Sequence, residues 1–243
     1  MARNLTPRIA GAALALLTIL GQSCLAAQGD VSRGEVVAAQ GSQKGAPACA
    51  QCHAFNGGSD ASGAFPRVAG QSALYLSKQL RDYSSGTRSN SLMSQISRAL
   101  SPQEIDDVAA YYAQEKATPF IPLRSGDPAL LKRGEQLATV GDNSRQLQSC
   151  NNCHGPGGSG EAPAIPYLAG QYSQYIVFTL KEWKHGFRKS SAEAMGVVAQ
   201  KMSDQDIAAV AVYFQQVRNA APATGSTTTA AQPAPAQPVK RKQ

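Results

Sequence analysis

Apolar side chains recur three or four positions apart in three segments of each half of the chain, which is the spacing of one face of an α-helix. Before the last of these segments in the first half, Ser101 and Glu104 form a capping-box pattern, with Pro102 at the first helical position. The pattern therefore predicts a helix that begins at residue 102. Its apolar stripe consists of Ile105, Val108, Ala109 and Tyr112.

Five further segments carry the same pattern. In the second half, Ser203 precedes the last stripe and Asp206 takes the place of the glutamate. Gly34 and Gly134 lie on the first stripe of each half, where a glycine lets another helix cross closely. No segment alternates as a β-strand does, so the sequence predicts an all-α fold. The five stripes are Gly34, Val37 and Ala38; Leu76, Leu80 and Tyr83; Gly134, Leu137 and Ala138; Ile176, Leu180 and Trp183; and Ile207, Val210, Ala211 and Phe214.

The two halves repeat one another. The offset between matching residues grows from 100 at Arg33 and Arg133 to 102 at Val108 and Val210, so only small insertions separate the copies. A period of this length indicates a duplicated domain and not a solenoid. Other matched pairs are Pro66 and Pro166, Gln71 and Gln171, Gly86 and Gly186, and Arg88 and Arg188.

The repeat divides the chain into tandem domains at residues 28–117 and 128–219. Residues 118–127 between them contain Pro119 and Pro122, which stiffen a linker and stop a helix from continuing. Residues 220–243 are rich in Ala, Pro, Thr and Gln and end in a basic cluster. Such a tail cannot bury enough apolar surface to fold, so it is predicted to be disordered, with a tether or an interaction arm as the alternative.

Residues 1–27 have the pattern of an export signal. Arg3 and Arg8 precede an apolar run of about a dozen residues, and small residues follow it. Cleavage after Ala26 or Ala27 would remove Cys24. Two alternatives are a lipid-modified Cys24 and an uncleaved anchor. The expected mature protein is exported to the periplasm, with at most peripheral membrane association.

Composition and charge exclude two classes of protein. Hydrophobic residues make up 42% of the 243 residues, which is too many for a chain disordered throughout. The formal net charge is +7, but five basic residues lie in the leader and the extreme tail, which leaves +2 for the body. Because the body has no stripe of lysine and arginine, no nucleic-acid partner is expected.

The motif Cys-x-x-Cys-His occurs twice, at equivalent places in the repeat. This spacing suits covalent haem attachment, in which each thiol adds to one vinyl group and the histidine binds the iron. A large bound group would also complete the core of a domain of about 90 residues, which is marginal on its own. The predicted attachment and iron-binding residues are Cys49, Cys52 and His53 in the first half, and Cys150, Cys153 and His154 in the second.

Three other uses of the cysteines are weaker. A four-cysteine zinc site would leave both following histidines unexplained. A redox-active dithiol would need a thioredoxin-like βαβ context, which is absent from the sequence pattern. Plain structural disulfides account for neither the histidines nor the duplication.

A low-spin electron carrier needs a sixth iron ligand, and methionines stand at matching positions. Met93 and Met195 each lie about 40 residues after the motif histidine, which predicts one His/Met haem in each half. Met202 aligns with Leu100 and is therefore predicted to be core. His185 aligns with Ser85 and is predicted to lie at the surface. With both axial positions filled, neither haem offers an open site, so electron transfer without substrate chemistry is expected; an enzyme with one open haem, such as a peroxidase, is the weaker alternative.

Together, the twin motifs, the segments Pro66…Ala69-Gly70-Gln71 and Pro166…Ala169-Gly170-Gln171, and the late methionines resemble the dihaem cytochrome c4 family. The likeness covers about residues 30–218. It implies two tandem class I cytochrome c domains, each a small helical bundle around a covalent haem c. It also implies that Pro66 and Pro166 accept the N–H of the proximal imidazoles.

The resemblance implies a periplasmic carrier that takes electrons from quinol–cytochrome c reductase and passes them to a terminal oxidase. An electron-transfer subunit of a dehydrogenase or a sulfur-oxidising complex is the alternative. The long tail ending in Lys240, Arg241 and Lys242 departs from the family pattern.

Overall fold

The computed structural model describes residues 29–59, 62–116 and 127–217. The predicted leader (1–27), the tail (220–243) and all of the predicted linker except Asp127 lie outside the described residues. Asp127 itself caps the first helix of the second half, where its side chain accepts the backbone N–H groups of Ala129 and Leu130.

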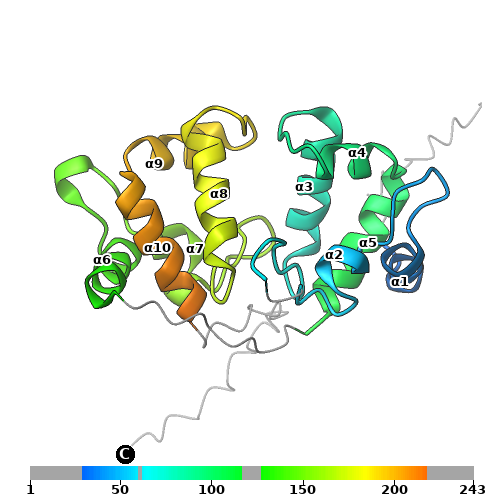
Figure 1. Ribbon diagram of the computed structural model, residues 1–243, viewed down its shortest axis with the longest axis horizontal. Coiled ribbons are helices and arrows are strands. Elements are labelled where there is room, and N and C mark those ends of the chain that lie inside the picture. Colours follow the sequence, from blue (N-terminus) through cyan, green and yellow to red (C-terminus); the bar gives the residue numbers. More distant parts are fainter. Residues whose placement is uncertain (1–28, 60–61, 117–126, 218–243) are drawn as a thin grey trace, which may run out of the picture.

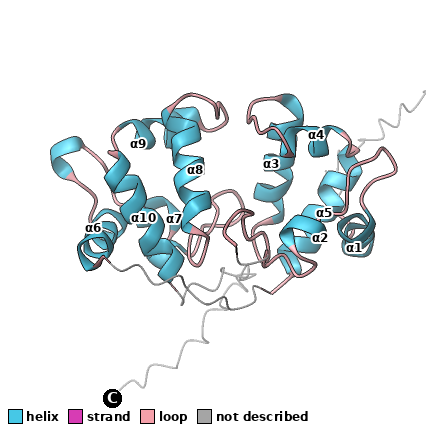
Figure 2. Cartoon of the chain, in the orientation of Figure 1, coloured by secondary structure: helices cyan, strands magenta, loops and turns pink. Residues whose placement is uncertain are grey.

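Each half is a bundle of helices joined by loops (Figure 2). The described residues contain isolated β-bridges but no strand. The first half contains α1 (Val31–Gln40), α2 (Ala50–His53), α3 (Ala73–Ser85), α4 (Met93–Arg98) and α5 (Pro102–Gln114). The second half contains α6 (Pro128–Thr139), η1 (Asn143–Arg145), α7 (Asn151–His154), η2 (Pro156–Gly158), α8 (Ser173–Lys184), η3 (Ala192–Gly196), α9 (Val197–Gln200) and α10 (Asp204–Gln216).

The two halves lie side by side, with α3 and α8 facing one another at the middle of the molecule (Figure 1). Helices α1 and α6 lie at the two outer ends, each crossed by the last helix of its own half. Within the described ranges, none of the helices combines the length and the apolar content that a membrane-crossing segment needs.

The predicted helix starts are confirmed. Ser101 and Glu104 form a capping box at the start of α5, with Pro102 in the first turn. Ser203 and Asp206 do the same for α10. In both boxes a side chain satisfies a backbone N–H that the helix itself cannot bond, so the starts of the two helices are defined locally.

The glycines of α1 and α6 permit the close helix crossings that the sequence predicts. A Cβ atom on Gly34 would lie 2.0 Å from the carbonyl oxygen of Asp107 in α5. A Cβ atom on Gly134 would lie 2.2 Å from the carbonyl oxygen of Ala209 in α10. Both distances are far inside van der Waals contact, so only glycine lets the two backbones approach this closely.

Ion pairs connect the same pairs of helices. The guanidinium Nε of Arg33 lies 2.7 Å from a carboxylate oxygen of the buried Asp107. In the second half, Arg133 and Arg145 both bond Asp206, at 2.9 Å and 2.5 Å. Although burial opposes ionisation, the hydrogen bonds from Arg145, Ser203 and Arg133 hold the pKa of Asp206 well below its usual range.

Each half has its own hydrophobic core, built from the predicted stripes. The stripes of α1, α5, α6 and α10 are buried. In α3, Tyr83 is buried, whereas Leu76 and Leu80 are only partly buried. These two leucines line a cavity beside the core, as do the buried Ile176 and Leu180 of the α8 stripe.

Gly134→Ala is expected to lower the free energy of unfolding by about 1–3 kcal/mol, because the added Cβ forces α6 away from α10. The measurement is urea unfolding of the holoprotein followed by circular dichroism. Gln136→Ala, at an exposed position of the same helix, is the control and should change the stability little. Equal effects of the two substitutions would contradict a tight crossing.

Candidate haem sites

One continuous cavity of about 610 Å³ runs through both halves, beside both cores. Its wall contains every residue that the sequence analysis selected for haem attachment, iron ligation or histidine support. They are Cys49, Cys52, His53, Pro66 and Met93 from the first half, and Cys150, Cys153, His154, Pro166 and Met195 from the second.

A single helical turn arranges each Cys-x-x-Cys-His motif. The backbone N–H of His53 bonds the carbonyl of Cys49 at 2.9 Å, and His154 bonds Cys150 in the same way at 2.9 Å. These turns are α2 and α7, whose N-caps are the first cysteines. The turn brings both cysteines and the histidine of each motif to the cavity wall.

The two motif histidines are held in one orientation by proline carbonyls. The Nδ1 atom of His53 lies 3.0 Å from the oxygen of Pro66, and that of His154 lies 2.8 Å from the oxygen of Pro166. A carbonyl only accepts, so each Nδ1 carries the hydrogen and Nε2 is left with the lone pair that binds a metal. Burial lowers the pKa of both imidazoles, which keeps them in the neutral form that a ligand requires.

None of the four motif cysteines, Cys49, Cys52, Cys150 and Cys153, is joined to another cysteine by a disulfide, so all four are available for haem attachment. Before a haem is attached, burial raises the pKa of the Cys49 and Cys150 thiols to about 11. The two pairs lie on separate helices, α2 and α7. Nowhere in the described ranges do three or more His, Cys, Asp or Glu side chains gather in a way that would hold a metal ion.

The two late methionines lie in different local structures. Met93 is the first residue of α4, where Asn90 accepts its backbone N–H at 2.9 Å. Met195 lies in η3, a π-helical turn, and its N–H bonds the carbonyl of Ser191 at 2.9 Å. Met202 is part of the second core and 4% exposed, and it also touches the cavity. His185 is exposed.

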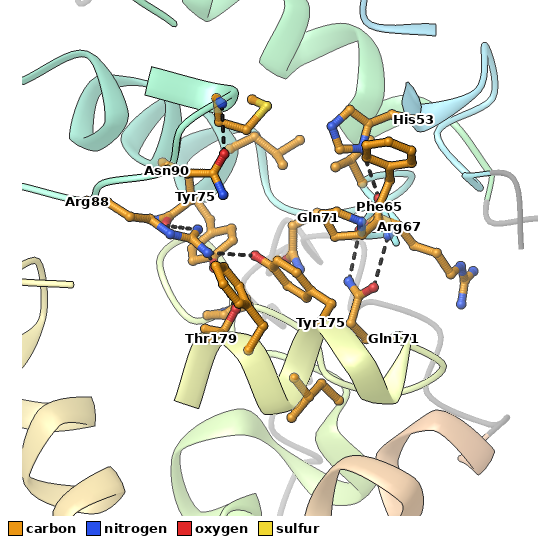
Figure 3. Close-up of a pocket in the computed structure, with 18 of the residues that line it drawn as sticks. His53, Phe65, Arg67, Gln71, Tyr75, Arg88, Asn90, Gln171, Tyr175 and Thr179 are labelled. Carbon is orange, nitrogen blue, oxygen red and sulfur yellow. Dashed lines mark hydrogen bonds between the residues drawn. The ribbon is translucent and has the colours of Figure 1, made fainter. Parts of the chain in front are cut away.

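A buried charge cluster at the contact between the halves has no role in the sequence analysis. Arg88, Arg188 and Glu182 are each less than 5% exposed. Arg88 lies 3.1 Å from Glu182 of the other half and 3.0 Å from Gln79. Its guanidinium also donates to the hydroxyl of Tyr175 at 3.3 Å (Figure 3). Arg188 stacks 3.8 Å above the ring of Trp183. The recurrence of Gly86 and Arg88 as Gly186 and Arg188 is the signal that marks these arginines in the sequence.

The lining of the cavity fits haem in its chemistry. The wall is mainly apolar, and each half contributes two cysteine sulfurs, a neutral imidazole and a thioether to it. Arg88 also lines the cavity, and its Nε has no hydrogen-bond partner within the described part of the chain. Glu182 forms an ion pair with Arg88, whereas the buried Arg188 has no carboxylate within ion-pair distance among the described residues, so the cluster suits the propionate groups that a haem carries.

Comparison with known proteins agrees with this chemistry. The cytochrome c family model matches the chain twice, at residues 38–114 and 132–218. Cytochrome c4 of Pseudomonas aeruginosa is 35% identical over 206 residues, which is 83% of this chain and 96% of that protein. A thiosulfate dehydrogenase electron acceptor of Stutzerimonas stutzeri is 39% identical over 210 residues, or 86% of this chain and 94% of that protein.

Solved structures show the same likeness. Reduced recombinant cytochrome c4 from Pseudomonas stutzeri superposes with a TM-score of 0.68 at 32% identity, covering 78% of this chain and all of that one. Thiosulfate dehydrogenase from Marichromatium purpuratum superposes with a TM-score of 0.71 at 35% identity, covering 77% of this chain but 40% of that one.

Two helical domains around one cavity, each with a haem-attachment motif, define an electron-transfer protein of the c type. The chain belongs to the cytochrome c4 family of dihaem cytochromes c. It therefore has two class I cytochrome c domains and carries two covalently bound haem c groups.

Arg88→Met is expected to lower the free energy of unfolding by about 3–5 kcal/mol, because it leaves the Glu182 carboxylate buried without its cation. The double variant with Glu182→Gln should recover part of this loss. Arg81→Met is the matched control, since the Arg81–Asp106 pair is exposed and worth less than about 1 kcal/mol. Urea unfolding of the holoproteins measures all three, and equal losses for Arg81→Met and Arg88→Met would contradict the expectation.

Proposed function

We propose that the protein is a periplasmic one-electron carrier with two His/Met haems. In this proposal His53 and Met93 bind the iron of the first half, and His154 and Met195 bind the iron of the second. Cys49 and Cys52, and Cys150 and Cys153, form the thioether bonds to the two porphyrins. The observation that carries the proposal is that each half brings a carbonyl-anchored histidine and a methionine to the wall of one apolar cavity.

The side chains of the cavity tune the transfer of electrons. When bound, each haem supplies an iron that takes up and releases one electron. The thioethers of Met93 and Met195 are soft ligands that favour the ferrous state and raise the reduction potential. The carbonyls of Pro66 and Pro166 keep the imidazoles oriented and neutral, and the apolar wall excludes water.

Two filled axial positions support a carrier and not an enzyme, because no iron site is left for a substrate. The predicted leader at 1–27 supports export to the periplasm, and the repeat supports domain bounds of 28–117 and 128–219 with a linker at 118–127. No nucleic-acid partner and at most peripheral membrane association are part of the same proposal. Electrons would pass from quinol–cytochrome c reductase to a terminal oxidase.

A second route has its own support. The Stutzerimonas stutzeri relative is named as a thiosulfate dehydrogenase electron acceptor, and it is 39% identical over 86% of this chain. The Marichromatium purpuratum structure is a thiosulfate dehydrogenase of which this chain matches 40%. In this alternative, a thiosulfate-oxidising dehydrogenase reduces the two haems in place of the quinol-linked enzyme.

Stopped-flow absorbance distinguishes the two routes. The oxidised holoprotein is mixed either with a purified quinol–cytochrome c reductase and quinol, or with a thiosulfate dehydrogenase and thiosulfate. Faster reduction by the reductase, followed by oxidation by a terminal oxidase, is the expected result. Reduction only by the dehydrogenase would replace the first route with the second. Failure of both donors to reduce the haems would contradict a carrier function.

Met93→Leu and Met195→Leu are each expected to remove one thioether–iron bond and to lower the potential of that haem. Each variant should keep both covalent haems and lose roughly half of the thioether-to-iron charge-transfer absorbance. Redox titration with absorbance spectra and mass spectrometry of the holoprotein provide the measurement.

Met202→Leu is the matched control, because Met202 also touches the cavity but aligns with a leucine in the repeat. It should leave the charge-transfer absorbance unchanged. A loss with Met202→Leu and none with Met195→Leu would reverse the ligand assignment in the second half.

A further inference from the structure

Two buried glutamines connect the halves at matching positions of the repeat. The side-chain oxygen of Gln171 accepts the backbone N–H of Arg67 at 2.9 Å, and its amide nitrogen donates to the carbonyl of Arg67 at 2.9 Å. Gln71 makes the same pair of bonds with Tyr167, at 3.2 Å and 3.3 Å. Each amide therefore bonds both backbone groups of one residue in the opposite half (Figure 3 shows the Gln171 pair).

The geometry fixes the orientation of both amides. Arg67 and Tyr167 each present one N–H donor and one C=O acceptor, so a flipped amide would place donor against donor and acceptor against acceptor. Gln71 is 5% exposed and Gln171 is 4% exposed, so water does not replace these bonds. The amides are thus held in single positions.

The residues that the glutamines bond directly follow the histidine-supporting prolines. The N–H of Arg67 and the C=O of Pro66 belong to one planar trans peptide unit. Its N–H donates to Gln171, while its C=O accepts from Nδ1 of His53. In the mirror arrangement, the peptide between Pro166 and Tyr167 donates to Gln71 and accepts from His154.

Hydrogen bonds on the two ends of one peptide strengthen each other. An acceptor on the N–H polarises the peptide and makes its carbonyl oxygen a better acceptor. A better acceptor on Nδ1 makes the imidazole a more electron-rich metal ligand. A change in one half is thereby passed to the histidine of the other half through a single rigid unit.

We infer that Gln71 and Gln171 are crossed positioning residues, each of which tunes the iron-binding histidine of the opposite half. Gln171 acts on His53 through the peptide of Pro66 and Arg67, and Gln71 acts on His154 through the peptide of Pro166 and Tyr167. The inference rests on the proposed function, since it takes His53 and His154 as the iron ligands. The reduction potential of each haem then depends on a glutamine of the opposite half as well as on its own half.

The test measures the reduction potential of each haem separately. The Met195→Leu background leaves one His/Met haem in the first half, and the Met93→Leu background leaves one in the second. Gln171→Leu is placed in both backgrounds, and the potential of the remaining His/Met haem is measured by redox titration of the full-length holoprotein.

Gln171→Leu should raise the potential of the haem in the first half and leave that of the second unchanged. Without the Gln171 acceptor, the Pro66 carbonyl holds the His53 hydrogen less strongly, and the ferric state is less stabilised. The expected change in the reduction equilibrium is up to about tenfold, which for one electron corresponds to about 59 mV. Gln71→Leu should give the mirror result, a shift of the second haem alone.

Two control variants separate positioning from loss of structure. Gln171→Glu keeps an oxygen acceptor for the Arg67 N–H, so it should return the potential toward the parent value. Tyr172→Phe removes another bond between the halves, from the Tyr172 hydroxyl to the Gly58 carbonyl at 3.1 Å, without touching either peptide. It should leave both potentials unchanged. If Gln171→Leu yields no holoprotein, Gln71→Leu provides the mirror measurement, a shift of the second haem alone.

The inference is overturned if each glutamine variant shifts both haems equally, if it shifts only the haem of its own half, or if Tyr172→Phe has as large an effect. Failure of the proposed function would be detected by a different measurement, the absorbance of the two methionine variants. In that case the Met93→Leu and Met195→Leu backgrounds would keep the full thioether-to-iron absorbance, before any glutamine is changed.

Discussion

The fold depends on filling one apolar cavity. The longest helices have only 13 residues, and the cavity of about 610 Å³ lies directly beside both cores. Leucine side chains of α3 and α8 form part of its wall. Two covalently held porphyrins would fill this space and could not leave, so the groups that carry the electrons would also complete the two hydrophobic cores. Stability and electron transfer therefore rest on the same contact surface.

The sequence predicts the features that arise locally. Capping boxes and the Cys-x-x-Cys-His turns each involve residues within one turn of helix, and their patterns are visible in a single sequence. The helix crossings join residues far apart in the chain, but a glycine on an apolar stripe marks one side of each crossing. Apolar stripes at helical spacing likewise predict which face of α5 and α10 is buried. The repeat adds a second copy of each pattern and so strengthens every one of these predictions.

Contacts between the halves could not be predicted in this way, because they depend on how two folded units dock. Arg88 bonds Glu182, 94 residues away, and nothing in the spacing of the two indicates a meeting. A repeated arginine is also typical of a solvated surface. The sequence also gives no sign of the π-helical turn around Met195, since its counterpart Met93 begins an ordinary α-helix. Only the docked arrangement of the halves explains why Arg88 and Glu182 are buried.

The hydrogen bonds between residues 67–71 and 167–171 form two equivalent sets. Gln171 bonds the backbone of Arg67 in the first half, and Gln71 bonds the backbone of Tyr167 in the second. An interface of this kind is isologous, the type by which identical subunits associate around a two-fold axis. The duplicated chain thus contains, in one polypeptide, the contact of a symmetric dimer. Tandem fusion fixes the stoichiometry of such a pair and frees its members to diverge, as Asp82 and Glu182 have done: Asp82 pairs with Lys78 in its own helix, whereas the longer Glu182 reaches Arg88 of the opposite half.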